Sequence, residues 1–202
     1  DANAMIDDIE LICGIRPAIT PRTTQLSSFY QIRIPNVISK IFTTIPGQDI
    51  GRRSSQTSLW PTFLLDNKCP KSVLREFCGG LLGGDGIAPY LSKMKTKNDT
   101  HKLDQSVLIG MSTRLENQPS MKIKMEALCD ILSRAGYPDC TLSNRVEIYS
   151  VKKTSISDDD LRSMFRIQIP RRKCDFLQRI GYRYCIHKQV RHTAAQSLWR
   201  FE

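Results

Sequence analysis

The sequence predicts an α+β fold that contains a diverged internal repeat. Two stretches, Phe29–Pro35 and Met164–Pro170, alternate apolar and polar residues and end at proline, which indicates strands with one buried face. A helical pattern that ends at glycine precedes each strand, over Met5–Gly14 and Met121–Gly136. Each copy therefore reads helix, strand, strand or loop, and a final helix.

The second copy carries opening elements that the first copy lacks. A helix is expected over Ser72–Gly84, followed by strands over Ala88–Ser92 and Ser106–Thr113. We therefore predict three regions, which are a partial first subdomain at 1–47, a linker at 48–70 and a second subdomain at 71–202. The linker is predicted from its polar, basic and proline-interrupted composition.

Composition favours a polyanionic partner. The chain has 202 residues, a formal net charge of +10 and a pI of about 9.4, and cationic side chains bind nucleic acid by releasing counterions from phosphates. No apolar run approaches the roughly 20 residues of a spanning helix, so no membrane partner is expected. Seven scattered cysteines without a Cys-x-x-Cys pair indicate buried thiols in a reducing, intracellular compartment, with a disulfide framework as the alternative.

The most informative motif is the glycine-rich run Cys78–Gly86. Its glycines at 79, 80, 83 and 84 recur at helical spacing, and each costs up to about 1 kcal/mol in a helix relative to alanine. Such a face lets two helix backbones approach closely. Asp85-Gly86 then ends the helix and places one carboxylate at the bottom of this seam. A glycine-rich loop of another enzyme is the alternative interpretation.

The run resembles the LAGLIDADG (DOD-type) motif of homing endonucleases found in inteins and mobile introns. Cys78 replaces the first Leu, and Gly83 replaces an Asp of the motif. A second stretch, Ile180–Arg191, is similar to the C-terminal signature of DOD endonucleases. The resemblance implies the LAGLIDADG αββαββα fold with saddle-shaped antiparallel sheets, in which the second copy is complete and the first is N-terminally truncated. It also implies a site-specific, metal-dependent double-strand DNA endonuclease. The alternative is a decayed or maturase-like DNA-binding module without cleavage.

The same resemblance implies the residues of a cleavage centre. Asp85 would bind Mg²⁺ or another divalent cation, with the backbone carbonyl of Gly84 as a second ligand. Lys188 would polarise the attacking water or stabilise charge on the leaving group, and Arg191 would face phosphate. The competing interpretations are that Asp85 only caps a turn and that the basic helix is only solvated.

The resemblance also implies that strands read the DNA, and exposed polar side chains of a twisted sheet can indeed enter the major groove. The predicted DNA-binding residues are Gln31, Arg33, Lys93, Lys95, Arg145, Arg166, Gln168 and Arg191. Any one of them could be an ordinary solvated side chain, so the prediction depends on the set.

The absence of a first Asp-Gly helix suggests that the chain is a fragment. With Asp85 as its one motif carboxylate, double-strand cleavage would need a second acid from elsewhere. We therefore expect self-association, or a missing N-terminal segment, through the glycine-rich helix. Without either, the seam around Gly79 and Gly83 is expected to be exposed.

Overall fold

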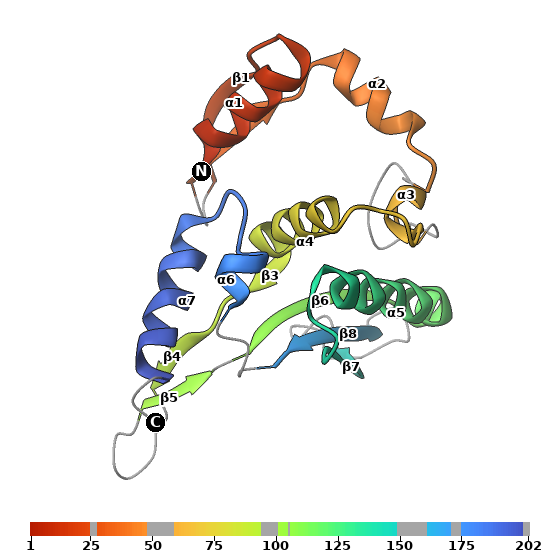
Figure 1. Cartoon of the computed structure of the whole chain (residues 1–202), viewed down its shortest axis with the longest axis vertical. Helices are drawn as coiled ribbons and strands as arrows, with labels where there is room; N and C mark the ends of the chain where they lie inside the picture. Colours follow the sequence, from red (N-terminus) through yellow and green to blue (C-terminus); the bar gives the residue numbers. More distant parts are fainter. Residues whose placement is uncertain are drawn as a thin grey trace.

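The computed structural model describes residues 1–24, 28–47, 59–93, 101–104, 106–148, 161–170 and 175–199 (Figure 1). It confirms the mixed α+β class with antiparallel sheets. The first region contains α1 (Ala2–Cys13), β1 (Ala18–Thr23), β2 (Ser28–Arg33) and α2 (Asn36–Thr44). The later elements are α3 (Thr62–Leu65), α4 (Lys71–Asp85), β3 (Gly86–Ile87), β4 (Tyr90–Lys93), β5 (His101–Asp104), β6 (Val107–Arg114), the 3-10 turn η2 (Leu115–Asn117), α5 (Gln118–Ala135), β7 (Thr141–Ile148), β8 (Leu161–Ile169), α6 (Phe176–Arg179) and α7 (Ile186–Trp199).

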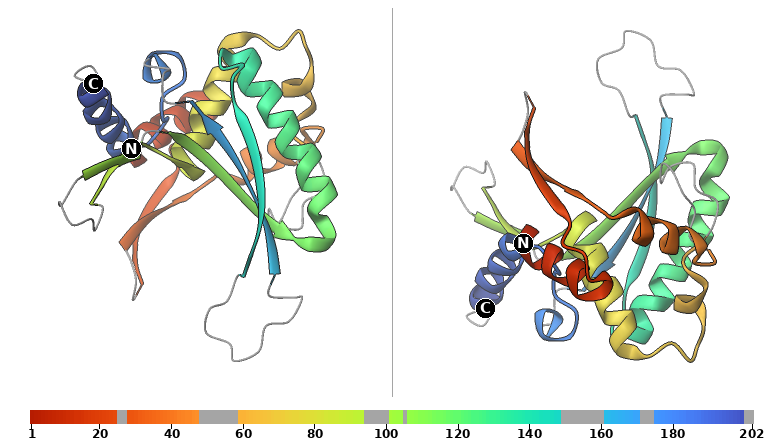
Figure 2. Two further views of the ribbon diagram at one scale, coloured as in Figure 1. Left: turned by 90° about the horizontal axis from the view of Figure 1, so that it is seen from below. Right: turned by 90° about the horizontal axis from the view of Figure 1, so that it is seen from above.

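The second region is built on a four-stranded antiparallel sheet in the order β3-β6-β8-β7. Helices α4 and α5 lie on one side of this sheet, and no described helix lies on the other side (Figures 1 and 2). The hairpin of β4 and β5 is a separate two-stranded sheet beside α7. From α4 to α6 the order is helix, two strands, helix, two strands, helix, counting β3 with β4 and β5 with β6 as interrupted strands.

Alternation along the two central strands explains why one sheet face is apolar. In β8 the buried residues Phe165, Ile167 and Ile169 alternate with residues of higher exposure. The facing residues of β6 are Met111, Ile109 and Val107, which are also buried. These strands and the two helices share a single core, so the prediction of one buried face is confirmed for the second copy.

Part of the predicted linker belongs to this core. Trp60 and Leu64 are both buried, and the Trp60 indole donates a hydrogen bond of 2.8 Å to the backbone carbonyl of Lys124 on α5. The Lys124 ammonium lies 5.0 Å from the centre of the Trp60 ring, a cation–π distance. The end of the predicted linker, residues 59–70, therefore packs against α5 and belongs to the core of the second region.

The first region has almost no core of its own. Its buried residues in the described part of 1–47 are Ile6, Pro17 and Ile38. Every residue of β1 is exposed, and β2 is exposed except for the half-buried Ile32. The predicted buried face of Phe29–Pro35 is therefore wrong for this chain, because α1 contacts β2 but leaves Tyr30 and Ile34 exposed.

Two contacts attach α1 to the start of α7. The Asp1 carboxylate accepts a hydrogen bond of 3.0 Å from the backbone N–H of Ile186, the first residue of α7. The Tyr184 hydroxyl donates to the Asp8 carboxylate, and this bond raises the pKa of Tyr184 to about 12. A carboxylate at a helix N-terminus is favourable, because the unpaired N–H groups and the helix dipole attract negative charge.

Among the helices that the structure describes, none combines the length and apolar character needed to cross a bilayer. The described cysteines are all free thiols. Cys78 lies in the core, where burial raises the pKa of its thiol to about 12.

Candidate nucleic-acid interface

The end of α4 is held by a lysine from a distant part of the chain. The Lys188 ammonium donates hydrogen bonds to the carbonyl oxygens of Leu82, Gly83 and Gly84, at 3.1, 2.6 and 3.0 Å. All three belong to the last turn of the helix, at the negative end of its dipole, and the Leu82 carbonyl also accepts the backbone N–H of Gly86. Lys188 therefore caps α4 one residue before Asp85.

The Asp85 carboxylate lies close enough to Lys188 to affect the pKa of its ammonium group. Burial lowers the pKa of Lys188, while the negative charge of Asp85 acts in the opposite direction. Asp85 is exposed and is the last residue of α4, immediately before β3. The structure therefore brings the two predicted catalytic residues to one place.

The glycine face of α4 packs against a loop. A side chain at Gly83 would overlap the carbonyl oxygen of Arg183, and a Cβ at Gly79 would lie 2.9 Å from the Arg183 Cγ. The backbone N–H of Arg183 donates to the Gly79 carbonyl oxygen at 2.9 Å. Gly79 and Gly83 are buried, so the prediction of an exposed seam at these residues is wrong.

The other two glycines of α4 leave open space. A Cβ at Gly80 or Gly84 would meet no atom within 4 Å apart from its own helix backbone and its chain neighbours. Any close helix contact of the predicted kind therefore has to use this second face of α4. Arg183 also forms a two-pronged ion pair with Glu76, which fixes the loop on the first face.

The predicted metal ligands fit a divalent cation in part. The Asp85 carboxylate is exposed and is an oxygen ligand of the kind that Mg²⁺ prefers. The Gly84 carbonyl already accepts the Lys188 ammonium. Within the ranges that the structure describes, no three His, Cys, Asp or Glu side chains converge as a ligand cluster. A cation on Asp85 would thus take most of its remaining ligands from water or from a bound phosphate.

The uncovered face of the sheet carries a set of arginines. Strand pairing places Arg166 of β8 opposite Gly110 of β6 and Ser143 of β7, and it places Arg162 opposite Arg114 and Glu147. The residues of these three strands that share this face, here called the open sheet face, are Leu108, Gly110, Ser112, Arg114, Thr141, Ser143, Arg145, Glu147, Arg162, Met164, Arg166 and Gln168. The open sheet face therefore carries four arginines and one acidic residue, Glu147.

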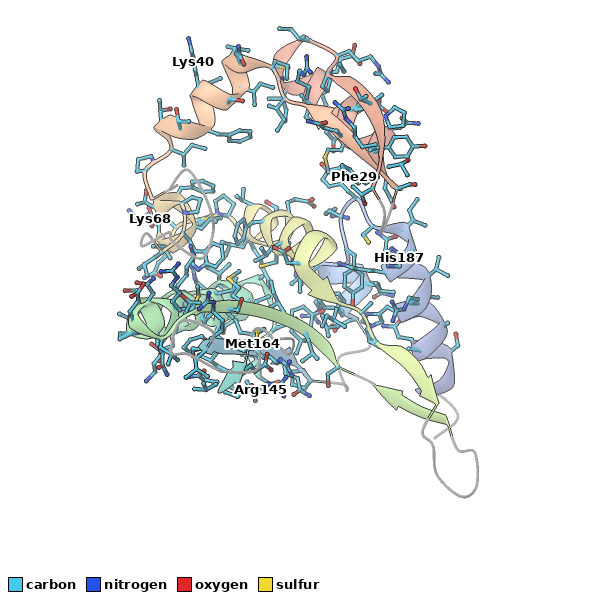
Figure 3. All side chains as sticks on the ribbon, turned by 180° about the vertical axis from the view of Figure 1, so that it is seen from behind. Phe29, Lys40, Lys68, Arg145, Met164 and His187 are labelled. Carbon is cyan, nitrogen blue, oxygen red and sulfur yellow. The ribbon has the colours of Figure 1, made fainter. Side chains whose placement is uncertain are left out.

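Glu147 forms ion pairs with two of these arginines. Its carboxylate pairs with Arg145, and it accepts a hydrogen bond of 3.3 Å from Arg166. Arg145 points away from the helical layer (Figure 3). The pairing orders both guanidinium groups while it cancels part of their charge.

The other predicted DNA-binding residues are dispersed. Gln31 and Arg33 lie on β2, in the repeat positions of Arg166 and Gln168. Arg191 is exposed on α7, one helical turn after Lys188. Lys93 ends β4, and Lys95 lies outside the described residues.

Sequence reasoning missed Arg114 and Arg162. Both lie just beyond the predicted strands, which were expected over Ser106–Thr113 and Met164–Pro170. The signal that could have found them is the continued alternation at each strand end. Their alignment opposite each other depends on register, which only pairing reveals.

The buried His192 of α7 packs this helix against α6 and Tyr182. The His192 ring stacks on Phe176 at 5.3 Å with an interplanar angle of 1°, and its Nδ1 lies 3.0 Å from the Tyr182 hydroxyl. Burial lowers the pKa of His192 to about 4, so the ring is neutral near pH 7. This cluster fixes the helix that carries Lys188.

No protein-family model matches this chain, and no curated protein and no solved structure matches it at a significant level.

Proposed function

We propose that the chain is a DNA-binding, metal-dependent endonuclease domain of the LAGLIDADG type. Double-stranded DNA would lie across the open sheet face, and Asp85 and Lys188 would act on one phosphodiester. The observation that carries the proposal is the meeting of Asp85 and Lys188 at the end of α4, where β3 enters the arginine-bearing sheet.

The order of elements supports this assignment. Residues 71–180 run helix, two strands, helix, two strands, helix, with antiparallel pairing throughout. The helices occupy one side of the sheet and leave the other side open (Figure 2). A curved sheet with one uncovered, polar face is a geometry that β-sheet proteins use to enter a DNA groove.

The electrostatics of the open sheet face support DNA as the ligand. Arg114, Arg145, Arg162 and Arg166 outnumber the single acid Glu147 on this face, and the chain carries a net charge of +10. Arginine binds phosphate oxygens in a two-pronged manner and also recognises guanine in the major groove. Gln168 and Ser143 add groups that can donate to or accept from base edges.

The chemistry of the α4 end supports phosphodiester cleavage. A divalent cation, when bound, would activate a water molecule and neutralise charge on the phosphate. Asp85 would hold that cation. The Lys188 ammonium would stabilise negative charge on the phosphate oxygens, since it already lies in a partly dehydrated position beside Asp85.

A specific observation also favours a second candidate, which is DNA binding without cleavage. Asp85 is the one carboxylate of the described α4 end, and Lys188 occupies the Gly84 carbonyl. A chain with this arrangement would bind DNA through the sheet and leave the backbone intact.

The decisive experiment uses a plasmid library with a randomised insert, incubated with the full chain in Mg²⁺ or in EDTA. Sequencing of linearised and nicked plasmids would reveal a shared cleavage sequence. We expect Mg²⁺-dependent nicking that Asp85→Asn abolishes while DNA binding in a gel-shift assay is retained. Binding without any nicking, by both proteins, would select the second candidate.

A charge-matched control separates specific binding from general basicity. Arg166→Ala removes a cation from the open sheet face, and Lys122→Ala removes one from exposed α5 on the helical side. We expect only the first variant to weaken DNA binding. Equal losses in both variants would contradict the placement of DNA on the sheet.

A further inference from the structure

We propose that the free edge of β7 binds the same edge of a second copy of this chain. The two β7 strands would run antiparallel about a twofold axis at Val146 and would join the two four-stranded sheets into one. This surface is separate from the glycine-rich face of α4. The inference concerns a protein–protein interface and does not depend on DNA binding or cleavage.

Strand β7 is a long strand at the edge of its sheet (Figure 2). It spans the eight residues Thr141–Ile148, and among the described residues it pairs with β8 alone. In an antiparallel sheet, alternate residues of an edge strand direct their backbone N–H and C=O groups away from the sheet, where another strand can bind them. The strand contains no proline or glycine that would oppose such pairing.

The charges of β7 suit pairing with an antiparallel copy of itself. Arg145 and Glu147 share one face of the strand and lie on either side of Val146. When the two Val146 residues lie opposite each other, Arg145 of each copy lies opposite Glu147 of the other. Opposite charges directly across two strands stabilise the pairing, and like charges destabilise it. A parallel pairing in the same register would place like charges opposite each other, so the charges select the antiparallel arrangement.

Val146 supplies apolar surface at the proposed axis. Its side chain is 56% exposed, although the neighbouring position on the same face, Asn144, lies opposite the buried Phe165 of β8. In the proposed pairing the two Val146 side chains would contact each other across the axis. Removing this apolar surface from water favours association.

A groove beside β7 leaves room for the second strand. It lies between α5 and β7 and has a volume of about 640 Å³. In the proposed register, the part of the second β7 that follows Val146 would run alongside Leu142–Asn144. Its side chains on the helical side would therefore enter the groove. The groove is lined by Gln118, Lys122, Glu126, Cys129, Cys140, Leu142, Ser143, Asn144 and Phe165.

A second copy fits this edge better than an unrelated strand. Any extended polypeptide can bind the free backbone groups of an edge strand. A twofold interface, however, uses one patch twice and therefore requires that the patch complement itself. The arrangement of Arg145, Val146 and Glu147 meets this requirement. Charged residues on edge strands commonly oppose association, but here each charge would meet its opposite.

The test exchanges charges between two variants of the full chain. Arg145→Glu would place Glu147 of each copy opposite a second carboxylate, and Glu147→Arg would place Arg145 of each copy opposite a second guanidinium. We expect the wild-type chain to dimerise as its concentration rises, and each variant to dimerise about tenfold or more weakly. Sedimentation equilibrium measures the dissociation constants.

A mixture of the two variants provides the decisive result. In a heterodimer of Arg145→Glu with Glu147→Arg, opposite charges face each other again at both positions, so we expect dimerisation to recover. Lys40→Glu on exposed α2 makes the same change of charge away from β7 and should leave dimerisation unaltered. A wild-type chain that stays monomeric, or a mixture of folded variants that does so, would overturn the proposal.

Cross-linking tests the register independently of charge. The two Val146 Cα atoms would lie about 5 Å apart, within the range that a disulfide spans, whereas the two Ser143 Cα atoms would lie roughly 20 Å apart. Under a mild oxidant, we expect Val146→Cys to form a disulfide-linked dimer above the wild-type background and Ser143→Cys not to do so. Equal cross-linking of the two variants would overturn the proposal.

A dimer through the open side of α4 is the competing outcome. A side chain at Gly80 would meet no neighbouring atom within the monomer, so Gly80→Lys would disrupt a contact between two α4 helices and leave β7 unaffected. We expect this variant to dimerise like the wild-type chain. A dimer that Gly80→Lys abolishes, and that Arg145→Glu and Glu147→Arg leave intact, would overturn the proposal.

Discussion

The Lys188 ammonium lies 2.6 Å from the carbonyl oxygen of Gly83, although 105 residues separate them in sequence. This contact joins the end of α4 to the first turn of α7 and places a cation beside Asp85. The lysine thus has a structural role in the described conformation, in addition to the chemical role proposed for it.

Lys188→Met should destabilise the fold. The substitution removes hydrogen bonds from an ammonium to three helix carbonyls, and we expect a loss of about 1–2 kcal/mol in the free energy of unfolding, since water can replace part of the interaction. Urea denaturation measures the change. Lys122→Met on exposed α5 is the control and should be nearly neutral. A neutral Lys188→Met would show that the cap contributes nothing.

The glycines of α4 should respond oppositely to alanine. Gly83→Ala forces a methyl group against the Arg183 carbonyl, and we expect a cost of about 1–3 kcal/mol from overpacking. Gly80→Ala meets open space and should stabilise the helix by about 0.5–1 kcal/mol. Thermal unfolding of the pair provides the comparison. Similar effects of the two substitutions would contradict the packing of the loop on Gly83.

Glu147→Gln should increase affinity for DNA. The substitution removes one negative charge from the open sheet face and releases Arg145 and Arg166 from their ion pairs. The slope of log affinity against log salt concentration should steepen by about 1 for each additional phosphate contact. Fluorescence anisotropy on a labelled duplex at several salt concentrations measures both quantities. Weaker binding would indicate instead that Glu147 orients the arginines productively.

Stability should fall as the pH is lowered from about 6.5 to 4. His192 has its folded-state pKa lowered to about 4 from 6.5, so in this window the unfolded chain binds the additional proton. Stability from this group is therefore complete above pH 6.5, and about 3 kcal/mol is lost by pH 4. Urea denaturation at a series of pH values measures the loss.

A double substitution tests that assignment. Tyr182→Phe with His192→Phe removes both partners of the Tyr182–His192 hydrogen bond together, so that neither of these two groups is left buried without the other. The double variant should lose the pH dependence between 6.5 and 4 that His192 causes. Tyr182→Phe alone should retain it.

The elements of the second copy were largely predictable from the sequence. The alternation in Met164–Pro170 and the helical pattern up to Gly136 depend on local periodicity, and both correspond to observed elements. The position of Gly136 follows from its φ of 125°, which other residues adopt only with strain. Local sequence patterns therefore predicted the elements of the second copy correctly, because the residues that pack against these elements are also part of the chain.

The errors arose where the outcome depended on distant residues. Alternation in Phe29–Pro35 predicted a buried apolar face, but it could not reveal that the contact with α1 leaves most of that face exposed. Glycine spacing in α4 predicted a close approach, but the partner proved to be the loop at Arg183 instead of a helix. The approach of Lys188 to α4 rested on the resemblance alone, since no local pattern links residues that far apart.

Alternation along β8 has a consequence for how this surface can change over generations. Residues that hold the fold together point to one side, and Arg162, Arg166 and Gln168 point to the other. Substitutions on the outer side would change the surface proposed to contact DNA and leave the core residues in place. Under the proposed function, new binding preferences could therefore arise on this face at a small cost in stability, which would come from contacts such as Arg166–Glu147 and Gln168–Ser106.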